Sequence, residues 1–225
     1  MPKTYYHAIM FDFDGTLVDT MHAYSQIASE EMEKIYGISS EIARQLYLET
    51  SGIPFFQQLD LLFGCGHKNI ECAERYERRK ALYLEKVNLT EKTRNTLRKI
   101  RSLGLSIAIT SNNFQKLIDQ FIINEPNLFD IVLGFRENMC KGPAQFCYVI
   151  DKFGIDRRYI LFIGDSLSDA RKALSFGIDF VAKSGTLPTE SFSGLFPTVP
   201  IISSLSELVK LLGKKIPLNR EEMKV

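Results

Sequence analysis

Five short apolar runs occur along the chain, and each is followed closely by a turn or by polar residues. The first covers residues 7–12, and the others lie at 106–111, 129–133, 159–164 and 178–182. Their apolar residues are nearly continuous rather than alternating with polar ones. We therefore expect strands that are covered on both faces, as in a parallel sheet.

Helix-like segments separate the later strands. They cover residues 91–103, 114–122, 143–153 and 169–176. Pro143 suits the first turn of a helix, and Gly154 and Gly177 suit positions just beyond helix ends. Strands that alternate with helices predict an α/β fold with a Rossmann-like, doubly wound parallel sheet.

Residues 20–88 break this alternation because they contain no convincing buried strand. One helical face carries Met21, Tyr24, Ile27, Ala28, Ile35 and Tyr36, and Gly37 follows it as a helix stop. Three more helices are expected at 41–49, 55–63 and 71–85. We interpret residues 19–89 as an all-helical cap domain, inserted into a core formed by residues 1–18 and 90–212. The polar segment 213–225 is expected to be a loosely held tail.

Composition is that of an ordinary globular protein. The chain has 225 residues, of which 45% are hydrophobic and 24% are charged. This length is enough for one good-sized domain, or for a core domain with a small accessory domain. A net charge of +1 gives no reason to expect nucleic acid or an anionic membrane as a partner. No apolar stretch reaches membrane-spanning length and the N-terminal pattern is not that of a signal peptide, so we expect a cytoplasmic protein. The sequence does not distinguish a monomer from a homodimer.

The four cysteines are expected to be reduced thiols in such a protein. Cys65, His67 and Cys72 lie close together in the sequence. Their spacing matches no common zinc pattern and a fourth ligand is missing, so a zinc site is not expected.

Polar residues gather where the predicted strands end, which is where open α/β sheets bind ligands. They are Asp12 and Asp14, Thr110 and Ser111, Lys141, and Asp165 and Asp169. In an extended chain, the side chains of Asp12 and Asp14 point the same way, and Gly15 then permits a tight turn. Carboxylates that converge in this way repel one another unless a cation lies between them, and oxygen ligands favour Mg²⁺.

Each of these signals has an alternative explanation when taken alone. The Asp-x-Asp-Gly run and Gly164-Asp165 could be turns, residues 111–113 could be a helix cap, and Lys141 could be a solvated charge. Taken together and in this order, a carboxylate cluster, a lysine and a hydroxyl predict phosphoryl transfer with an aspartate nucleophile.

Four motifs resemble those of the haloacid dehalogenase superfamily, in the branch of phosphoglycolate phosphatase and β-phosphoglucomutase. They are residues 11–20 (FDFDGTLVDT), 107–112 (IAITSN), 141–143 (KGP) and 163–169 (IGDSLSD). The first and fourth motifs are highly specific, whereas the second and third would be weak alone. The third departs from the family pattern, because Gly142 separates the lysine from the proline and Cys140 beside it is unexplained.

The resemblance implies a role for each site residue. Asp12 would be the nucleophile that forms an aspartyl-phosphate, and Asp14 the general acid and base. Mg²⁺ would be held by Asp12, the Asp14 backbone carbonyl and Asp165, with Asp169 supporting the metal or pairing with Lys141. The phosphoryl oxygens would be bound by Ser111, Asn112 and Lys141.

The resemblance also narrows the reaction. The dehalogenase branch lacks an acid at the position of Asp14, so Asp14 favours phosphate chemistry. Members that cleave phosphonates use a lysine in the cap, but neither Lys34 nor Lys68 has a telling context. The expected function is therefore Mg²⁺-dependent hydrolysis of a small phosphorylated metabolite.

The insert resembles a helical cap that closes over the site. Residues 50–54 (TSGIP), with Gly52, would be the loop that reaches the substrate, although a simple interhelical turn is an equal alternative. Arg44 and Gln45 could contact the substrate or simply face solvent. The main alternative function is a sugar phosphomutase, and a binding module or a receiver domain is less compatible with the complete motifs and the insert.

Overall fold

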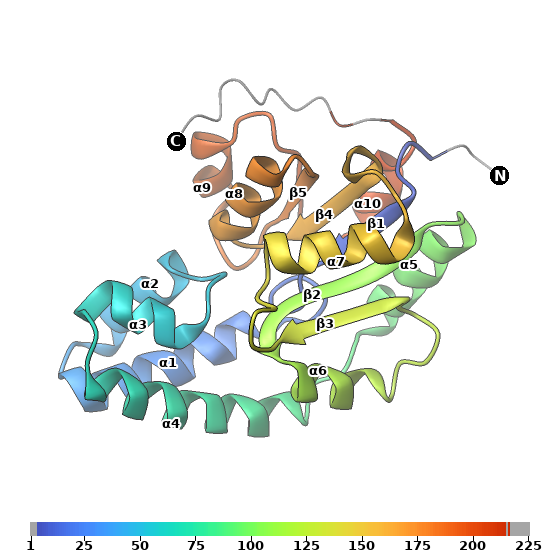
Figure 1. Cartoon of the computed structure of the whole chain (residues 1–225). Helices are drawn as coiled ribbons and strands as arrows, with labels where there is room; N and C mark the ends of the chain where they lie inside the picture. The colour runs from blue at the N-terminus through green and yellow to red at the C-terminus, as the bar shows by residue number, and fades with distance from the viewer. Residues whose placement is uncertain (1–3, 215, 217–225) are drawn as a thin grey trace.

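The structure is a computed structural model, and it describes residues 4–214 and 216. Its centre is a six-stranded, all-parallel sheet in the order β3-β2-β1-β4-β5-β6 (Figure 1). The strands are β1 (Ala8–Phe11), β2 (Ser106–Phe114), β3 (Ile131–Phe135), β4 (Ile160–Gly164), β5 (Asp179–Lys183) and β6 (Ile201–Ile202). The predicted α/β doubly wound sheet is confirmed.

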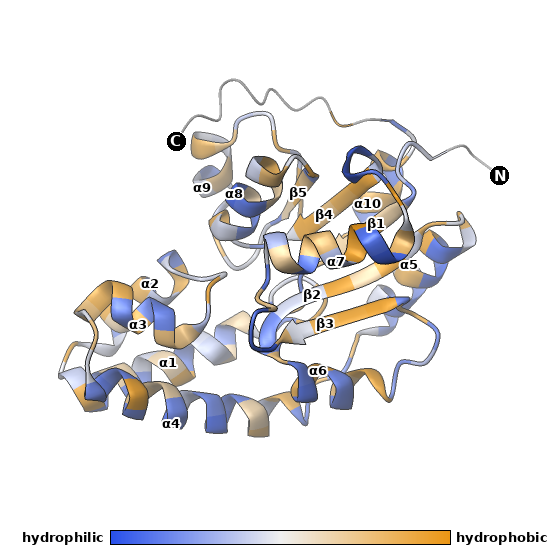
Figure 2. Ribbon diagram, in the orientation of Figure 1, coloured by the Kyte–Doolittle hydropathy of each residue, from blue (hydrophilic) through white to orange (hydrophobic). Residues whose placement is uncertain are grey.

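Strand β1 lies in the middle of the sheet and is buried throughout. Ala8 pairs with Ser106 of β2 on one side and with Ile160 of β4 on the other. Figure 2 shows the strands as the most hydrophobic ribbons of the sheet domain. Strand β1 has a partner strand at both edges and helices on both faces. The residues that directly follow its C-terminal end are therefore held in a fixed position.

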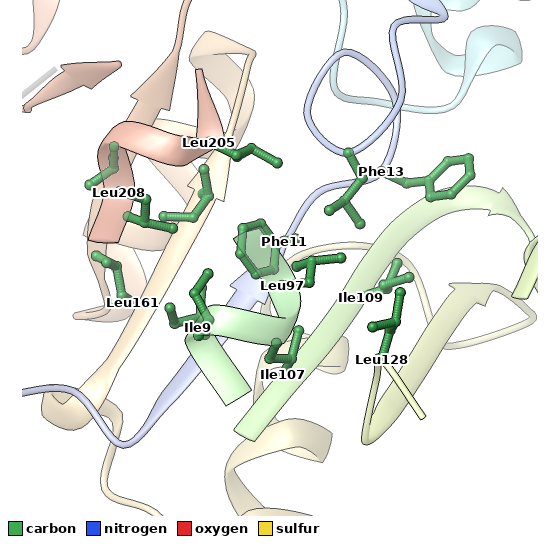
Figure 3. Close-up of a cluster of buried hydrophobic side chains, with 14 of the residues drawn as sticks. Ile9, Phe11, Phe13, Leu97, Ile107, Ile109, Leu128, Leu161, Leu205 and Leu208 are labelled. Atoms are coloured by element: carbon green, nitrogen blue, oxygen red, sulfur yellow. The ribbon is translucent and has the colours of Figure 1, made fainter. Parts of the chain in front are cut away.

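Alternate residues of β1 enter two separate apolar layers. Ile9 and Phe11 pack with helices α5 (Glu91–Ser102), α6 (Gln115–Ile122) and α10 (Leu205–Leu211) (Figure 3). Ala8 and Met10 pack on the other face with α7 (Pro143–Phe153), α8 (Leu167–Phe176) and α9 (Thr189–Leu195). This two-sided burial explains the continuous apolar runs in the sequence.

Four consecutive helices follow β1 and form a body of their own (Figure 1). They are α1 (Met21–Tyr36), α2 (Ser40–Glu49), α3 (Phe55–Phe63) and α4 (His67–Leu84). Their apolar side chains make a third cluster, centred on residues such as Tyr24, Met32 and Leu59. The two connections to the sheet domain lie side by side, because residues 16–19 line one surface pocket together with Thr90, Lys92 and Thr93.

Most helix ends agree with the sequence predictions. Pro143 starts α7, and Gly37, Gly154 and Gly177 end helices in the left-handed conformation. Helix α4 begins at His67, four residues earlier than predicted. Its first turn is held by Asn69, which donates to Asp60 Oδ1 at 2.6 Å and accepts from the Tyr36 hydroxyl at 2.6 Å. Such tertiary hydrogen bonds leave no periodic signal in the sequence.

The C-terminal part contains elements that no pattern predicted, namely β6, α9, α10 and a short 3-10 turn at Arg157–Tyr159. The expected loose tail is wrong for Ile216, which is 4% exposed and belongs to the core. Its amide donates to the Tyr6 hydroxyl at 3.1 Å. Residues 215 and 217–225 of that expected tail lie outside the described residues.

Within the described part of the chain, no helix combines the length and the apolar character needed to cross a membrane.

Candidate active site

Three aspartates meet at the C-terminal ends of the two central strands. Asp12 directly follows β1, Asp165 directly follows β4, and Asp169 lies in the first turn of α8. One carboxylate oxygen from each lies within 4.8 Å of the others, and all three residues are buried. The parallel sheet therefore brings together carboxylates that are about 150 residues apart in the sequence, as predicted from the strand ends.

Lys141 supplies a positive charge within this cluster. Its Nζ lies 2.7 Å from Asp12 Oδ1 and 2.7 Å from Asp169 Oδ1. Burial alone would lower the pKa of Lys141, but the two carboxylates raise it above its ordinary value. The lysine is therefore charged, and it orients Asp12 while pairing with Asp169.

One lysine does not balance the carboxylates. Burial raises the pKa of Asp12 well above its ordinary value; Lys141 opposes this shift, whereas Asp169 and Asp165 reinforce it. Burial and the Asp169 charge likewise raise the pKa of Asp165 to about 6. Buried, acceptor-rich carboxylates with too little positive charge fit a hard divalent cation, so Asp12, Asp165 and Asp169 have the donor chemistry that Mg²⁺ requires.

The carboxylate of Asp14 lies apart from this cluster. It accepts hydrogen bonds from Thr20 Oγ1 to Oδ1 and from Asn113 Nδ2 to Oδ2, both at 2.7 Å. Asp14 also lines the cavity between the insert and the sheet domain. Its side chain thus faces the place where a substrate would lie, while Asp12 faces the acidic cluster.

The turn after β1 leaves no room for a larger residue. Gly15 has φ +74°, and a Cβ at this position would collide with the side chains of Asp165 and Thr186. Thr186 Oγ1, from the loop after β5, donates a hydrogen bond to Asp165 Oδ2. A glycine is therefore needed both for the left-handed turn and for close packing against Asp165.

Asp169 is fixed by the start of its own helix. The Ser166 hydroxyl caps α8 by accepting from the Asp169 amide at 3.0 Å, and it donates to Asp169 Oδ2 at 2.7 Å. The carboxylate has therefore little freedom to move away from Lys141.

The second motif is placed less directly than expected. Strand β2 continues to Phe114 with an irregular register between Thr110 and Phe114, so residues 111–113 belong to the strand end. Ser111 is buried and its hydroxyl accepts from the Asn113 amide at 3.0 Å. Asn112 and Asn113, rather than Ser111, are among the residues that line the cavity.

Gly52 ties the insert to the sheet domain. Its carbonyl oxygen accepts from Asn112 Nδ2 at 3.0 Å, from Lys172 Nζ at 2.7 Å and from Ser168 Oγ at 3.4 Å. Loop 50–54 thus reaches the strand ends, and Gly52 faces three donors of the sheet domain. Arg44 is half-buried and contacts His22 at 2.8 Å, and the exposed Gln45 donates to Glu49 at 2.8 Å. Neither lines the cavity beside Asp12.

These residues enclose a small cavity of about 60 Å³ between the insert and the strand ends. Asp12, Asp14, Asp165 and Lys141 line one side, and side chains of α1 and α4 line the other. The volume is that of a few water molecules, which suits a compact ligand.

A family described as haloacid dehalogenase-like hydrolase matches residues 9–183, which include all four sequence motifs. The chain belongs to this family.

Individual relatives agree with the family. A phosphoglycolate phosphatase of Pseudomonas putida is 27% identical over 193 residues, covering 80% of this chain and 70% of the relative. A phosphoglycolate phosphatase of Synechococcus elongatus is 25% identical over 186 residues, covering 78% of this chain and 82% of the relative. A crystal structure described as a haloacid dehalogenase-like hydrolase of Bacteroides fragilis has a TM-score of 0.75 at 24% identity, covering 90% of this chain and 99% of that one.

Some residues of this haloacid dehalogenase-like site escaped the sequence analysis. Thr186 follows the fifth strand, so the strand-end argument could have included it. Asn113 lies one residue beyond the second motif. Gln145 donates to the carbonyls of Ser111, Gly134 and Met139 at 3.0, 3.1 and 3.2 Å, and thereby positions the segment around Lys141. Tyr24 was predicted only as part of an apolar helix face, and Lys172 and Lys80 gave no sequence signal, because the placement of all three at the site depends on packing between domains.

Proposed function

We propose that this protein is a Mg²⁺-dependent phosphatase that hydrolyses a small phosphorylated metabolite through a phosphoryl-Asp12 intermediate. The observation that carries the proposal is the contact of Lys141 with both Asp12 and Asp169, at 2.7 Å each, inside a buried carboxylate cluster. A phosphoryl group needs an oriented nucleophile and positive charge, and this arrangement offers both. The phosphatase names of the relatives support the same reaction and favour it over a mutase.

Asp12, Asp165 and the backbone carbonyl of Asp14 would hold Mg²⁺, with Asp169 supporting the site. When bound, the ion would supply positive charge that offsets the charge of the phosphoryl oxygens. The raised pKa of both Asp12 and Asp165 supports this assignment, because burial and the charge of Asp169 disfavour their anionic forms and a bound cation would offset that cost.

In the first step, a carboxylate oxygen of Asp12 attacks phosphorus and the ester oxygen leaves. Asp14, in its protonated form, gives that oxygen a proton. In the second step, water attacks the phosphoryl-aspartate, and Asp14 takes up the proton that the water loses. Lys141, Ser111 and the backbone of Asn112 would bind the phosphoryl oxygens, and the Asp12 carboxylate is released with inorganic phosphate.

The insert, with proposed boundaries 19–89, would act as a cap on the core of residues 1–18 and 90–212. The three hydrogen bonds to the Gly52 carbonyl support a closed arrangement over Asp12. Closure would exclude bulk water and select small substrates. A cap in this position makes a phosphoprotein an unsuitable substrate.

The test is phosphate release from a panel of small phosphomonoesters, including phosphoglycolate, sugar phosphates and nucleoside monophosphates. We expect release that requires Mg²⁺, stops with a chelator and falls at least about 1,000-fold in Asp12→Asn, because the nucleophile is lost. Asp19→Asn is the matched control, since Asp19 is exposed on the same segment.

Equal release by wild type and Asp12→Asn, or none from any panel member, would refute the proposal. Conversion of a sugar phosphate into its isomer in the presence of a sugar bisphosphate would instead support the phosphomutase alternative.

A further inference from the structure

The side of the cavity that the cap forms includes tyrosine side chains and a lysine. Tyr24 from α1 and Tyr76 and Lys80 from α4 line it opposite the aspartates. None of these side chains takes part in the phosphoryl-transfer steps above. They surround whatever part of the substrate lies beyond the phosphoryl group.

Lys80 is a buried ammonium with unused hydrogen-bonding capacity. The residue is 7% exposed, and Nζ lies 5.3 Å from the ring centre of Tyr24 and 5.5 Å from that of Tyr76. Its ion-pair partner is Glu77, at 3.4 Å from Nζ. An ammonium has three donors and is costly to bury, so aromatic faces and one long ion pair leave room for a further acceptor.

The Tyr24 hydroxyl is a second unused donor at the same wall. Tyr24 is fully buried, and its hydroxyl makes no close hydrogen bond within the described part of the chain, although it interacts with the nearby carboxylate of Asp14. Burial raises the pKa of Tyr24 well above its ordinary value, and the Asp14 charge adds to the shift, so the hydroxyl keeps its proton. A buried donor without an acceptor lowers stability, and a ligand that accepts its hydrogen bond can relieve this cost.

Both donors belong to residues that line the same small cavity. The Lys80 ammonium lies over the Tyr24 ring, and both residues line the cavity that contains Asp12. A compact anionic group can accept from the lysine and the hydroxyl together, whereas an alkyl group would leave both unsatisfied. The three donors of Lys80 allow Glu77 to remain paired when that group binds.

We propose that Lys80 and Tyr24 form a specificity subsite for a carboxylate at the end of the substrate remote from its phosphoryl group. The substrate would thus be a short phosphomonoester of a hydroxy acid. This inference rests on the proposed phosphatase function and adds the chemical class of the substrate. The Lys80 ammonium attracts the carboxylate through its charge, and the Tyr24 hydroxyl orients the carboxylate through a hydrogen bond.

The test compares matched substrates that differ only in the distal group. Suitable pairs are 2-phosphoglycolate with 2-hydroxyethyl phosphate, and 3-phosphoglycerate with glycerol phosphate. We expect the wild type to prefer the carboxylate member of at least one pair by about 10- to 100-fold in kcat/KM, as for a hydrogen bond to a charged group. Lys80→Met should remove most of this preference, and Tyr24→Phe should reduce it about 3- to 10-fold.

The preference is the ratio of kcat/KM for the two members of a pair, measured on the same variant, so a loss of rate that is common to both members does not change it. Lys80→Arg should retain part of the preference, and Lys68→Met, which removes an exposed lysine of the same helix, should retain all of it. Thermal unfolding of each variant separates a folding defect from a loss of recognition.

The outcomes distinguish the two proposals. A wild type that releases phosphate without favouring a carboxylate refutes the subsite alone. Equal losses on both members of a pair assign Lys80 a purely structural role and also refute it. A wild type that acts on no phosphomonoester refutes the phosphatase proposal, and the subsite falls with it.

Discussion

Lys172 reaches from α8 to the cap loop, where its Nζ lies 2.7 Å from the carbonyl oxygen of Gly52. Burial lowers the pKa of Lys172 to about 8, and the nearby charge of Lys141 contributes to the shift. The lysine is therefore charged at neutral pH and loses its proton as the pH rises through about 8. The charged form donates the stronger hydrogen bond to the cap.

Lys172→Met should weaken the closed arrangement of the cap. We expect KM for a small phosphomonoester to rise about 10- to 100-fold at pH 7, the range for one lost hydrogen bond from a charged group. The wild-type KM should itself rise between pH 7 and 9, and the variant should lack this rise. Steady-state kinetics measure both effects, with Lys99→Met, at an exposed position of α5, as the control.

Gly15→Ala tests the close packing beside Asp165. The new methyl group would push against Asp165 and Thr186, so we expect at least about a 100-fold loss of kcat and a higher Mg²⁺ concentration for half-saturation. Gly104→Ala is a matched control, because Gly104 also has a positive φ, of +84°, but open space around it. Gly104→Ala should lose about 1 kcal/mol of stability through backbone strain, Gly15→Ala should lose more because of the added collision, and only Gly15→Ala should lose activity. Equal activity would contradict the packing argument.

Asp14→Asn tests the proton transfer to the leaving group. We expect kcat for an alkyl phosphate to fall about 100- to 10,000-fold, as for loss of a general acid–base. The loss should be much smaller for p-nitrophenyl phosphate, whose leaving group needs little protonation. Losses of the same size on both substrates would contradict the assignment. Asp19→Asn should leave both rates unchanged.

The lowered pKa of Glu31 predicts how the stability of the cap depends on pH. Burial would raise its pKa, but hydrogen bonds from Arg75, Arg79 and Lys34 lower it to about 2. A pKa near 2 in the folded chain and near its ordinary value in the unfolded chain corresponds to roughly 3 kcal/mol of stability at neutral pH. Because the folded pKa is the lower one, this stability is present above the unfolded pKa and is lost as pH falls toward 2.

Glu31→Gln should therefore lower the free energy of unfolding on the order of 3 kcal/mol at pH 7, and much less near pH 3. Urea unfolding at the two pH values measures the difference. Glu33→Gln is the control, because Glu33 is an exposed residue of the same helix. A loss that is independent of pH would show that packing, rather than charge, explains the effect.

The sheet was predictable because each central strand is buried on both faces and leaves a continuous apolar run. Strand β6 was not predictable, because it has only two residues and these are too few to form a recognisable pattern. The same physics made the carboxylate cluster predictable: strand ends of a parallel sheet meet at one edge, so Asp12 and Asp165 had to be neighbours. Asp169 follows from the first turn of the helix after Asp165.

The same reasoning could not predict which residues of the insert line the cavity. Helix α4 is densely charged, and its sequence does not reveal that Lys80 turns inward while Lys68 stays exposed. That choice depends on how α4 packs on α1 and how the pair sits over the strand ends. Lys172 is similar, since its partner is a backbone carbonyl 120 residues away.

The connections on either side of the insert lie side by side on the surface of the sheet domain. A segment whose two ends meet can be exchanged as a cassette, because its removal leaves only a short gap to bridge. If the insert selects the substrate as proposed, the reaction chemistry and the choice of substrate would be carried by separately heritable pieces of the chain. Recombination at this junction, in nature or in the laboratory, would then retarget the enzyme while leaving the aspartates of the proposed active site untouched.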